Sequence, residues 1–260
     1  MFARLTEIFR YREAARLLTL RELKVRYSNS TMGIVWSLFH PLLLTVFFSI
    51  VFSVAMPSPI ANYPIFFLAA LLPWNFFNVS VVGSTNTITG NHSLVNRVYF
   101  PREILPLAVV AANALNFLVA LAPLALLMLV FGVPFTWALL WLPVLILVQF
   151  ALSSGLALAL SALNVYFRDV QQIVEVLMLP WFFLTPIVYS SELITNATVR
   201  QLVFVANPMA SLVTFYRQAI YFGQTPDFGM LAVAGAEAGL VLVAGLIIFR
   251  RASPHFVDEI

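Results

Sequence analysis

Two long stretches of this sequence contain no formally charged side chain. They cover residues 27–96 and 104–167 and are 70 and 64 residues long. A charged residue at the centre of a bilayer costs roughly 2.5–3.5 kcal/mol on insertion scales, whereas one membrane-spanning helix needs about 20 apolar residues. Each neutral stretch is therefore long enough for two membrane-spanning helices and a short connection, and we expect a helical hairpin in each.

Turn sequences divide the apolar pattern into six expected membrane-spanning helices. Pro57-Ser58-Pro59 and Gly132-Val133-Pro134 mark two of the connections, because these sequences do not continue a helix. The expected spans are residues 35–55, 65–82, 104–131, 138–163, 170–189 and 230–249. The expected fold is an all-α polytopic membrane protein that forms a single domain over residues 1–260.

Residues 190–229, between the fifth and sixth expected spans, do not form a simple span. Arg200, Pro208 and Arg217 interrupt their apolar runs, which are too short or too polar to cross a bilayer. This pattern favours two short helices broken at Asn207-Pro208. These helices either re-enter the outer leaflet, where protein or water covers their ends, or form an ordinary helical loop.

Composition and charge agree with this arrangement. The chain is 62% hydrophobic and only 10% charged, which is typical of an integral membrane protein. An even number of spans places both termini on one side. If that side is the cytoplasm, twelve of the fourteen Lys and Arg residues lie inside and only Arg200 and Arg217 lie outside. The positive-inside rule therefore predicts a multi-pass membrane protein with both termini in the cytoplasm.

The N-terminal segment, residues 1–34, carries seven basic residues before position 27. Leucines interleaved with arginines predict an amphipathic helix that lies in the inner membrane interface. Thr19-Leu20-Arg21-Glu22 matches a capping box, which predicts that a new helix begins at Thr19. The alternative is a basic flank that only reflects the positive-inside rule.

A second cytoplasmic segment, residues 84–103, is long for a hairpin connection. It favours either a short helix that docks a cytosolic protein or a solvated loop. Arg168 and Asp169 form a tight inner turn before the fifth expected span, where an acidic residue suits a helix N-terminus. The candidate docking residues are Asn91, His92, Ser93, Leu94, Val95, Asn96, Arg97, Val98, Tyr99 and Phe100.

No catalytic or metal-binding constellation is recognisable in the sequence. A GxxxxGK[ST] motif is missing and Lys24 is the only lysine, so the chain lacks the usual phosphate-binding loop for a nucleotide. The three histidines do not have metal-ligand spacing. Because the chain contains no cysteine, disulfides and thiolate metal sites are excluded.

Two acidic residues fall inside expected spans. Glu175 and Glu237 are either proton relays of a secondary transporter or partly hydrated groups with local partners. Glu237 lies between Gly235 and Gly239, and this spacing of small residues predicts a close helix contact.

Aromatic residues are abundant, with 24 Phe, 8 Tyr and 5 Trp. Most are expected to face lipid or to anchor the membrane interface. Rings that line a passage would instead offer flat faces on which sugars stack. The candidates for such a lining are Trp74, Phe77, Trp181, Phe182 and Tyr189.

Short motifs spread along nearly the whole chain resemble the permeases of polysaccharide-export ABC transporters, which carry O-antigen, capsular polysaccharide or teichoic acid. His40 stands where the family pattern often has Asn. The motifs are Arg21-Glu22-Leu23-Lys24-Val25-Arg26-Tyr27, Gly33-Ile34-Val35-Trp36, His40-Pro41-Leu42, Asn96-Arg97-Val98-Tyr99-Phe100-Pro101, Tyr166-Phe167-Arg168-Asp169-Val170, Thr185-Pro186-Ile187-Val188-Tyr189, Asn207-Pro208-Met209 and Tyr216-Arg217.

The resemblance implies a homodimeric permease that exports a lipid-linked polysaccharide. Two copies of a separate ATPase subunit would bind ATP and Mg²⁺, so this chain would need no cofactor of its own and no nucleic acid partner. Residues 91–100 would form a coupling helix on that ATPase. The other implied sites are the inner face where the lipid-linked glycan enters, with Arg21, Glu22, Lys24, Arg26 and Tyr27, and an outer gate with Asn207, Pro208, Tyr216 and Arg217.

Three other functions compete with this interpretation. A drug-efflux permease of an ABC transporter is the closest rival. A proton-coupled secondary transporter would use Glu175 or Glu237. A membrane enzyme acting on lipid-linked sugars would need paired carboxylates or a metal site, and the sequence offers neither.

Overall fold

The computed structural model describes residues 11–27, 35–52, 60–97, 100–193 and 195–259, and all regular structure in these ranges is helical. The elements are α2 (Arg12–Tyr27), α3 (Val35–Ile50), α4 (Tyr63–Thr85), α5 (Thr87–Gly90), α6 (His92–Arg97), α7 (Ile104–Val130), η2 (Trp137–Trp141), α8 (Leu142–Tyr166), α9 (Val170–Leu184), η3 (Ser191–Leu193), α10 (Ala197–Ala206), α11 (Pro208–Arg217), η4 (Gln218–Phe222), α12 (Phe228–Ala252), η5 (Ser253–His255) and α13 (Phe256–Glu259).

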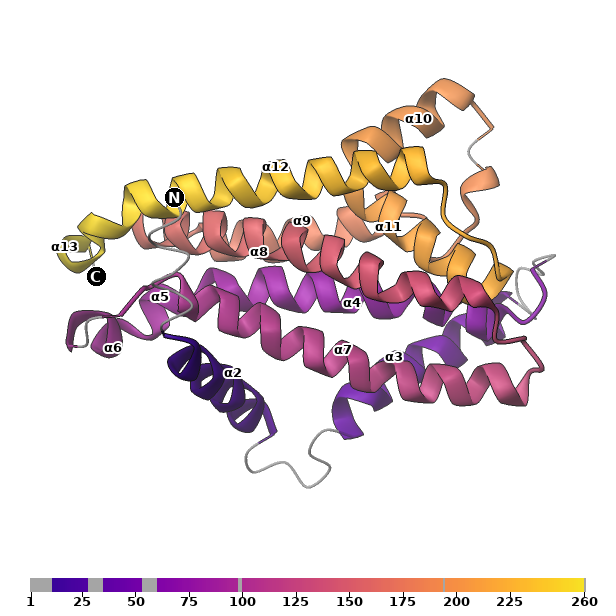
Figure 1. Cartoon of the computed structure of the whole chain (residues 1–260), viewed down its shortest axis with the longest axis horizontal. Helices are drawn as coiled ribbons and strands as arrows, with labels where there is room; N and C mark the ends of the chain where they lie inside the picture. Colours follow the sequence, from indigo (N-terminus) through magenta and orange to yellow (C-terminus); the bar gives the residue numbers. More distant parts are fainter. Residues whose placement is uncertain (1–10, 28–34, 53–59, 98–99, 194, 260) are drawn as a thin grey trace.

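Four long helices, α4, α7, α8 and α12, run along the length of the molecule (Figure 1). Among the described residues these four, with η2 continuing into α8, are long and apolar enough to cross a membrane. They confirm the expected helices at residues 65–82, 104–131, 138–163 and 230–249, with ends that differ by a few residues.

The two remaining expected spans are shorter helices. α3 ends at Ile50 and α9 at Leu184. With 15 residues, α9 is about 22 Å long, less than the roughly 30 Å hydrocarbon core of a bilayer. The sequence places its end too late, at residue 189. The physical reason is that Pro186 disfavours helical backbone at the preceding residue, and Thr185 is extended, with ψ 130°.

α4 is the centre of the bundle. It contacts α3, α7, α8, α9 and α11 and is buried over most of its surface. Small residues such as Ala69, Ala70 and Ser84 allow these helices to approach closely. Gln149 of α8, which is fully buried, donates a hydrogen bond of 2.6 Å to the carbonyl oxygen of Pro73 inside α4.

The long helices α8 and α12 pack along each other and cross where Gly155 meets Gly245. The expected close contact through Gly235 and Gly239 is not made within the described part of this chain, where an added Cβ at either glycine would meet no atom within 4 Å. Ala234 and Ala238 face the bundle in their place.

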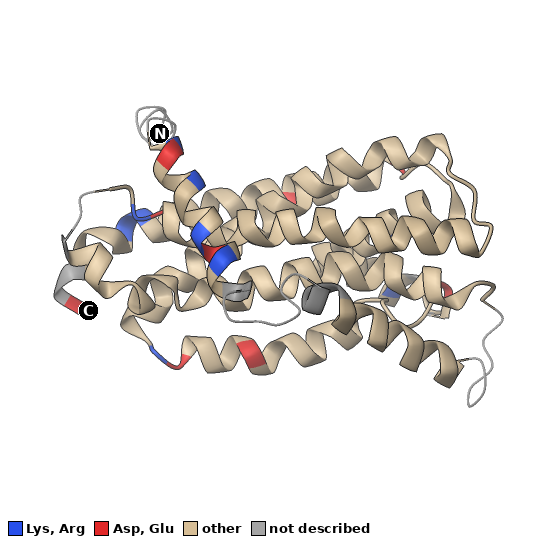
Figure 2. Cartoon of the chain, turned by 90° about the horizontal axis from the view of Figure 1, so that it is seen from below, with Lys and Arg blue, Asp and Glu red and all other residues tan. Residues whose placement is uncertain are grey.

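The molecule has two distinct ends (Figure 1). We define the inner end as the one with α2, α5, α6 and α13, and the outer end as the one with α10 and α11. Figure 2 shows most of the charged ribbon at the inner end, while the middle of the long helices carries almost none. The charge asymmetry of the sequence thus becomes a physical asymmetry of the bundle.

α2 is one continuous helix that packs against α7. The expected helix start at Thr19 is therefore wrong. The Thr19 hydroxyl donates to the carbonyl oxygen of Ala15 at 2.8 Å, a bond between residues four apart that is typical of a helix interior. On the exposed side, Leu17 and Val25 lie among basic side chains.

Candidate functional site

The expected coupling residues 91–100 contain one short helix, α6, and the short helix α5 directly precedes it; we call α5 and α6 together the expected coupling segment. α5 and α6 meet at Asn91, whose side-chain Nδ2 donates to the Thr87 carbonyl oxygen at 2.9 Å. Arg21 of α2 donates from Nη1 to Asn91 Oδ1 at 3.1 Å. This bond connects two inner-face regions that the sequence treats as separate sites.

The coupling segment has an apolar base and a polar surface. Ile88 and Val95 are buried in a cluster with Ala162 and Val165 of α8. Leu94 and Phe100 are half-buried against the same cluster. His92, Ser93 and Asn96 are exposed, whereas the side chain of Arg97 and residues Val98 and Tyr99 lie outside the described part of the chain. A firmly seated segment with polar side chains pointing outward can serve as a docking surface.

The second inner turn places Arg168 and Asp169 at the surface. Asp169 precedes α9, but its side chain makes no capping hydrogen bond. Asn164 at the end of α8 has that role, since its Oδ1 accepts from the N–H of Gln171 at 3.2 Å. Its Nδ2 is 3.5 Å from Thr89 Oγ1 in α5.

Sequence reasoning missed Asn164. The available signal was an amide side chain at the end of a long neutral stretch, directly before a tight turn. The other predicted inner-face residues lie on α2, where Arg21 and Lys24 are exposed and Glu22 is half-buried. Arg26 and Tyr27 belong to the last turn of α2, and their side chains lie outside the described part of the chain.

Four of the five predicted lining aromatics form one cluster between the middle of α4 and α9. Trp74 packs on Phe77 and Phe182, with ring centroids 5.7 Å apart in each pair, and Phe77 packs on Trp181 at 5.2 Å. Trp74 and Phe77 are buried, while Trp181 and Phe182 are half-buried. In this conformation the two residues from α9 are therefore the more accessible members. Tyr189 lies apart and donates its hydroxyl to the carbonyl of Phe183.

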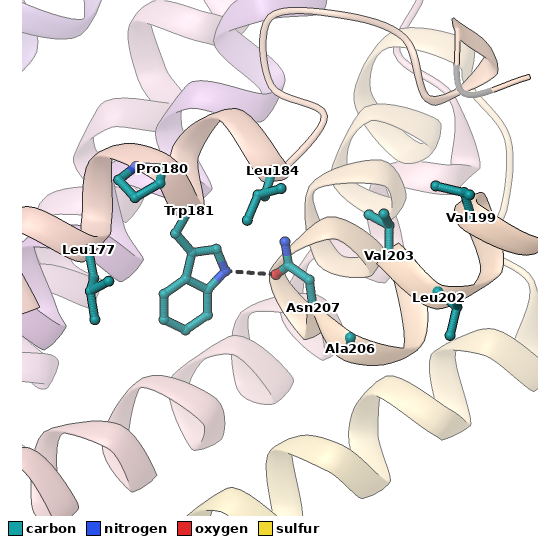
Figure 3. A pocket seen from close by; sticks show the side chains of 9 residues that line it. All are labelled: Leu177, Pro180, Trp181, Leu184, Val199, Leu202, Val203, Ala206 and Asn207. Atoms are coloured by element: carbon teal, nitrogen blue, oxygen red, sulfur yellow. Dashed lines mark hydrogen bonds between the residues drawn. The ribbon is translucent and has the colours of Figure 1, made fainter.

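The expected break at Asn207-Pro208 is confirmed, because α10 ends at Ala206 and α11 begins at Pro208. Asn207 Oδ1 accepts from the N–H of Met209, which caps α11, and from Trp181 Nε1 at 2.9 Å (Figure 3). Asn207 Nδ2 donates to Thr185 Oγ1 at 3.0 Å. One buried amide thus joins the outer end of α9 to the helix pair.

An apolar groove of about 560 Å³ lies between α9 and α10 beside this amide. The Trp181–Asn207 hydrogen bond occupies the polar atoms at its edge, so the surface offered by the groove is almost entirely hydrocarbon (Figure 3). Its lining consists of Leu177, Pro180, Trp181, Leu184, Val199, Leu202, Val203, Ala206 and Asn207.

Arg217, at the end of α11, is only 4% exposed. Its guanidinium donates to the carbonyl oxygens of Pro186 (2.9 Å), Ile187 (2.7 Å), Tyr189 (3.3 Å) and Phe66 (3.2 Å). It also lies 3.6 Å from the centroid of the Phe66 ring. The adjacent Tyr216 is fully buried, edge-to-face against Phe117. The predicted gate residues therefore hold α11 inside the bundle.

A bundle of long apolar helices, with a polar segment at its charged end and a broken helix pair at the other, is the architecture of a multi-pass membrane protein. The chain belongs to the ABC-2 type transporter family, whose model matches residues 13–221. Membership in this family implies a separate ATP-binding subunit.

Three relatives show where the chain lies within this family. It is 35% identical over 254 residues to the O-antigen export system permease protein RfbA of Myxococcus xanthus, covering 98% of both chains. It is 28% identical over 243 residues to a protein of the same name from Klebsiella pneumoniae, covering 93% of both. It is 25% identical over 251 residues to the polysialic acid transport protein KpsM of Escherichia coli, covering 90% of this chain and 91% of the relative.

Proposed function

We propose that this chain is the permease subunit of an ABC transporter that exports a lipid-linked polysaccharide, resembling O-antigen, across the bacterial inner membrane. The observation that carries the proposal is the 35% identity to an O-antigen export permease over 98% of both chains. A match of that length covers the membrane helices, the coupling segment and the helix pair together. The transported glycan and its carrier lipid are therefore inferred from whole-chain similarity, not from one motif.

The proposal includes six membrane crossings with both termini in the cytoplasm. Four crossings are α4, α7, α8 and α12, and the other two are α3 and α9. The shorter helices can reach both interfaces if their flanking segments contribute or the bilayer thins locally. The charge distribution supports this orientation, because the inner end carries α2 and the basic end of α12.

Two copies of this chain and two copies of an ATP-binding subunit form the proposed transporter. The ATP-binding subunits bind and hydrolyse ATP with Mg²⁺, and α5 and α6 seat on them through His92, Ser93 and Asn96. Nucleotide binding draws the two ATP-binding subunits together and moves the coupling segments. The permease copies then part along their interface, and the α10–α11 pair opens an exit for the glycan, with Trp181 and Phe182 near its path.

The geometry of Glu175 does not favour a role as a proton relay, whereas Glu237 in α12 has a buried carboxylate oxygen, Oε2, with no hydrogen-bond partner among the described residues. Glu175 is exposed on α9 and its Oε1 accepts a hydrogen bond of 3.1 Å from Gln171 Nε2, so it has a local partner one helical turn away. Family membership further indicates ATP as the energy source.

Reconstitution tests the proposed function. Purified chain is placed in proteoliposomes with and without its ATP-binding subunit, and lipid-linked O-antigen is supplied on the side that binds ATP. We expect glycan to reach the opposite side only with the second subunit and hydrolysable ATP. Export by this chain alone would exclude the ATP-driven mechanism, and transport of apolar dyes with no glycan export would favour a drug-efflux permease.

A further inference from the structure

The helix α9 packs against the bundle along one narrow face, which includes Val174 and Met178, and most of its other side chains are exposed. Of its fifteen residues, only Val174 and Met178 are fully buried. Its neighbour α8, by contrast, buries residues along its whole length, including Leu145, Leu152 and Leu158. Burial of apolar side chains fixes a helix against its neighbours, so packing within this chain holds α9 less firmly than α8.

Buried amides hold both ends of α9. At the inner end, Asn164 is 3% exposed, caps the first turn through the N–H of Gln171, and faces Thr89 of α5 through Nδ2. At the outer end, Asn207 is 8% exposed and binds both Trp181 and Thr185. Buried polar groups that lose their partners are costly, so each amide tends to move together with the groups that it binds.

We propose that Asn164 is a positioning residue that couples the α5–α6 segment to α9, and that α9 transmits movement of that segment to the α10–α11 pair through Asn207. The inference rests on the proposed function, since it assumes that the ATP-binding subunit moves α5 and α6. Because α9 connects the two amides, a displacement of its inner end can be carried to its outer end.

Asn164→Asp tests whether the contact between Asn164 and Thr89 transmits movement from α5 to α9. The aspartate keeps an oxygen for the N–H of Gln171, and its negative charge suits the N-terminus of α9. It loses the N–H donor toward Thr89. The aspartate also places a charge at a site that is only 3% exposed, which lowers stability, so unfolding curves accompany this variant. Thr89→Val, which adds no charge, must show the same coupling defect.

The experiment uses the complete complex with its ATP-binding subunit in nanodiscs and proteoliposomes. Because the chain has no cysteine, spin labels at Gln201→Cys in α10 and Ala232→Cys in α12 report the movement of the helix pair by pulsed electron paramagnetic resonance. ATP hydrolysis and glycan export are measured on the same preparations. The variants are Asn164→Asp, Asn164→Ala, Thr89→Val, the Thr89→Val/Asn164→Asp double variant and Asn207→Ala, with Gln172→Ala, an exposed neighbour on α9, as the control.

We expect Asn164→Asp to hydrolyse ATP normally, to lose the nucleotide-dependent change in label distance, and to export about tenfold less glycan per ATP, within the 5- to 150-fold range of typical coupling effects. Thr89→Val should give the same defect, and the double variant should be no worse than either single change, because both remove one contact. Asn207→Ala should also abolish the distance change, while Gln172→Ala should behave like the unmodified protein.

Full distance changes and normal export per ATP in both Asn164 variants would overturn the inference and leave the proposed function intact. If the unmodified complex shows no nucleotide-dependent distance change and no ATP-driven export, the proposed function fails and the inference fails with it.

Discussion

Gly155 of α8 and Gly245 of α12 bring two helix backbones into direct contact. A Cβ atom added at Gly245 would lie 2.0 Å from the carbonyl oxygen of Gly155, and one added at Gly155 would lie 2.5 Å from the backbone of Val241. In lipid, where apolar surface gains little from association, such close backbone approach is a main source of helix–helix attraction. This crossing therefore determines how α12 packs on the bundle.

Gly245→Ala should destabilise the protein by about 1–3 kcal/mol, because the added methyl forces two backbones apart. Thermal or SDS-induced unfolding of the purified protein measures the change. The matched control is Gly239→Ala on the same helix, where the methyl meets no atom within 4 Å. This control should be neutral or slightly stabilising, because alanine is the better helix former. Equal effects of the two substitutions would contradict the crossing.

Arg217→Lys should lower the free energy of unfolding by roughly 1.5–3 kcal/mol, although the positive charge is kept. The planar guanidinium donates hydrogen bonds to four carbonyl oxygens that surround it. A lysine ammonium has fewer donors and does not reproduce these four bonds. The free energy of unfolding in detergent is the measurement. Arg200→Lys, at an exposed position on α10, serves as the control and should change stability by less than about 0.5 kcal/mol.

Trp74→Ala should lower stability by about 3–5 kcal/mol, because the indole is 4% exposed and packs on Phe77 and Phe182. Trp137→Ala removes an indole that is 86% exposed and should have little effect on the free energy of unfolding. If Trp74→Ala left stability unchanged but abolished glycan export, the residue would have to line the passage.

His92→Asp should weaken binding of the ATP-binding subunit and leave the folded stability of the permease unchanged, since His92 is exposed on α6. Val95→Asp should instead unfold the segment, because Val95 is 3% exposed within an apolar cluster. Pull-down of the ATP-binding subunit, combined with unfolding curves for both variants, distinguishes the two effects. Normal binding by His92→Asp would argue against docking at this face.

Single-cysteine variants test the orientation directly, since the natural chain contains no cysteine. His255→Cys should react with a membrane-impermeant maleimide only when the cytoplasmic side is accessible. Thr198→Cys on α10 should react from outside intact cells. Labelling of His255→Cys in intact cells would reverse the proposed topology.

The sequence predicted four long helices and the break at Asn207 correctly because these depend on local composition. Long neutral stretches select bilayer-spanning helices, and Asn207-Pro208 supplies a cap followed by a residue suited to the first helical turn. The capping box at Thr19 gave a wrong prediction because it, too, is a purely local signal. The same four residues also fit a helix interior, and packing against α7 favours the continuous helix over a break.

The candidate site could be predicted only in outline. The family resemblance implied Arg217 and Asn207 as outer-gate residues, but it did not give their partners, which are distant in sequence: the carbonyls of Pro186 and Ile187 and the side chain of Trp181. Asn164 was missed because its neighbour Asp169 is the more familiar capping residue. The N–H groups at a helix N-terminus donate to any suitably placed oxygen, and the fold brings the Asn164 amide oxygen, not the Asp169 carboxylate, within hydrogen-bond distance of Gln171.

By itself the sequence determined that this protein crosses a membrane several times and which end of the bundle carries most of the charge. The cost of burying charge in hydrocarbon depends on composition and length alone, so it can be read without the fold. Only the tertiary structure decided which glycines touch, which amides bind the ends of α9, and which aromatics are buried. Those contacts join residues from different helices, and their geometry depends on the angle and depth at which the helices pack.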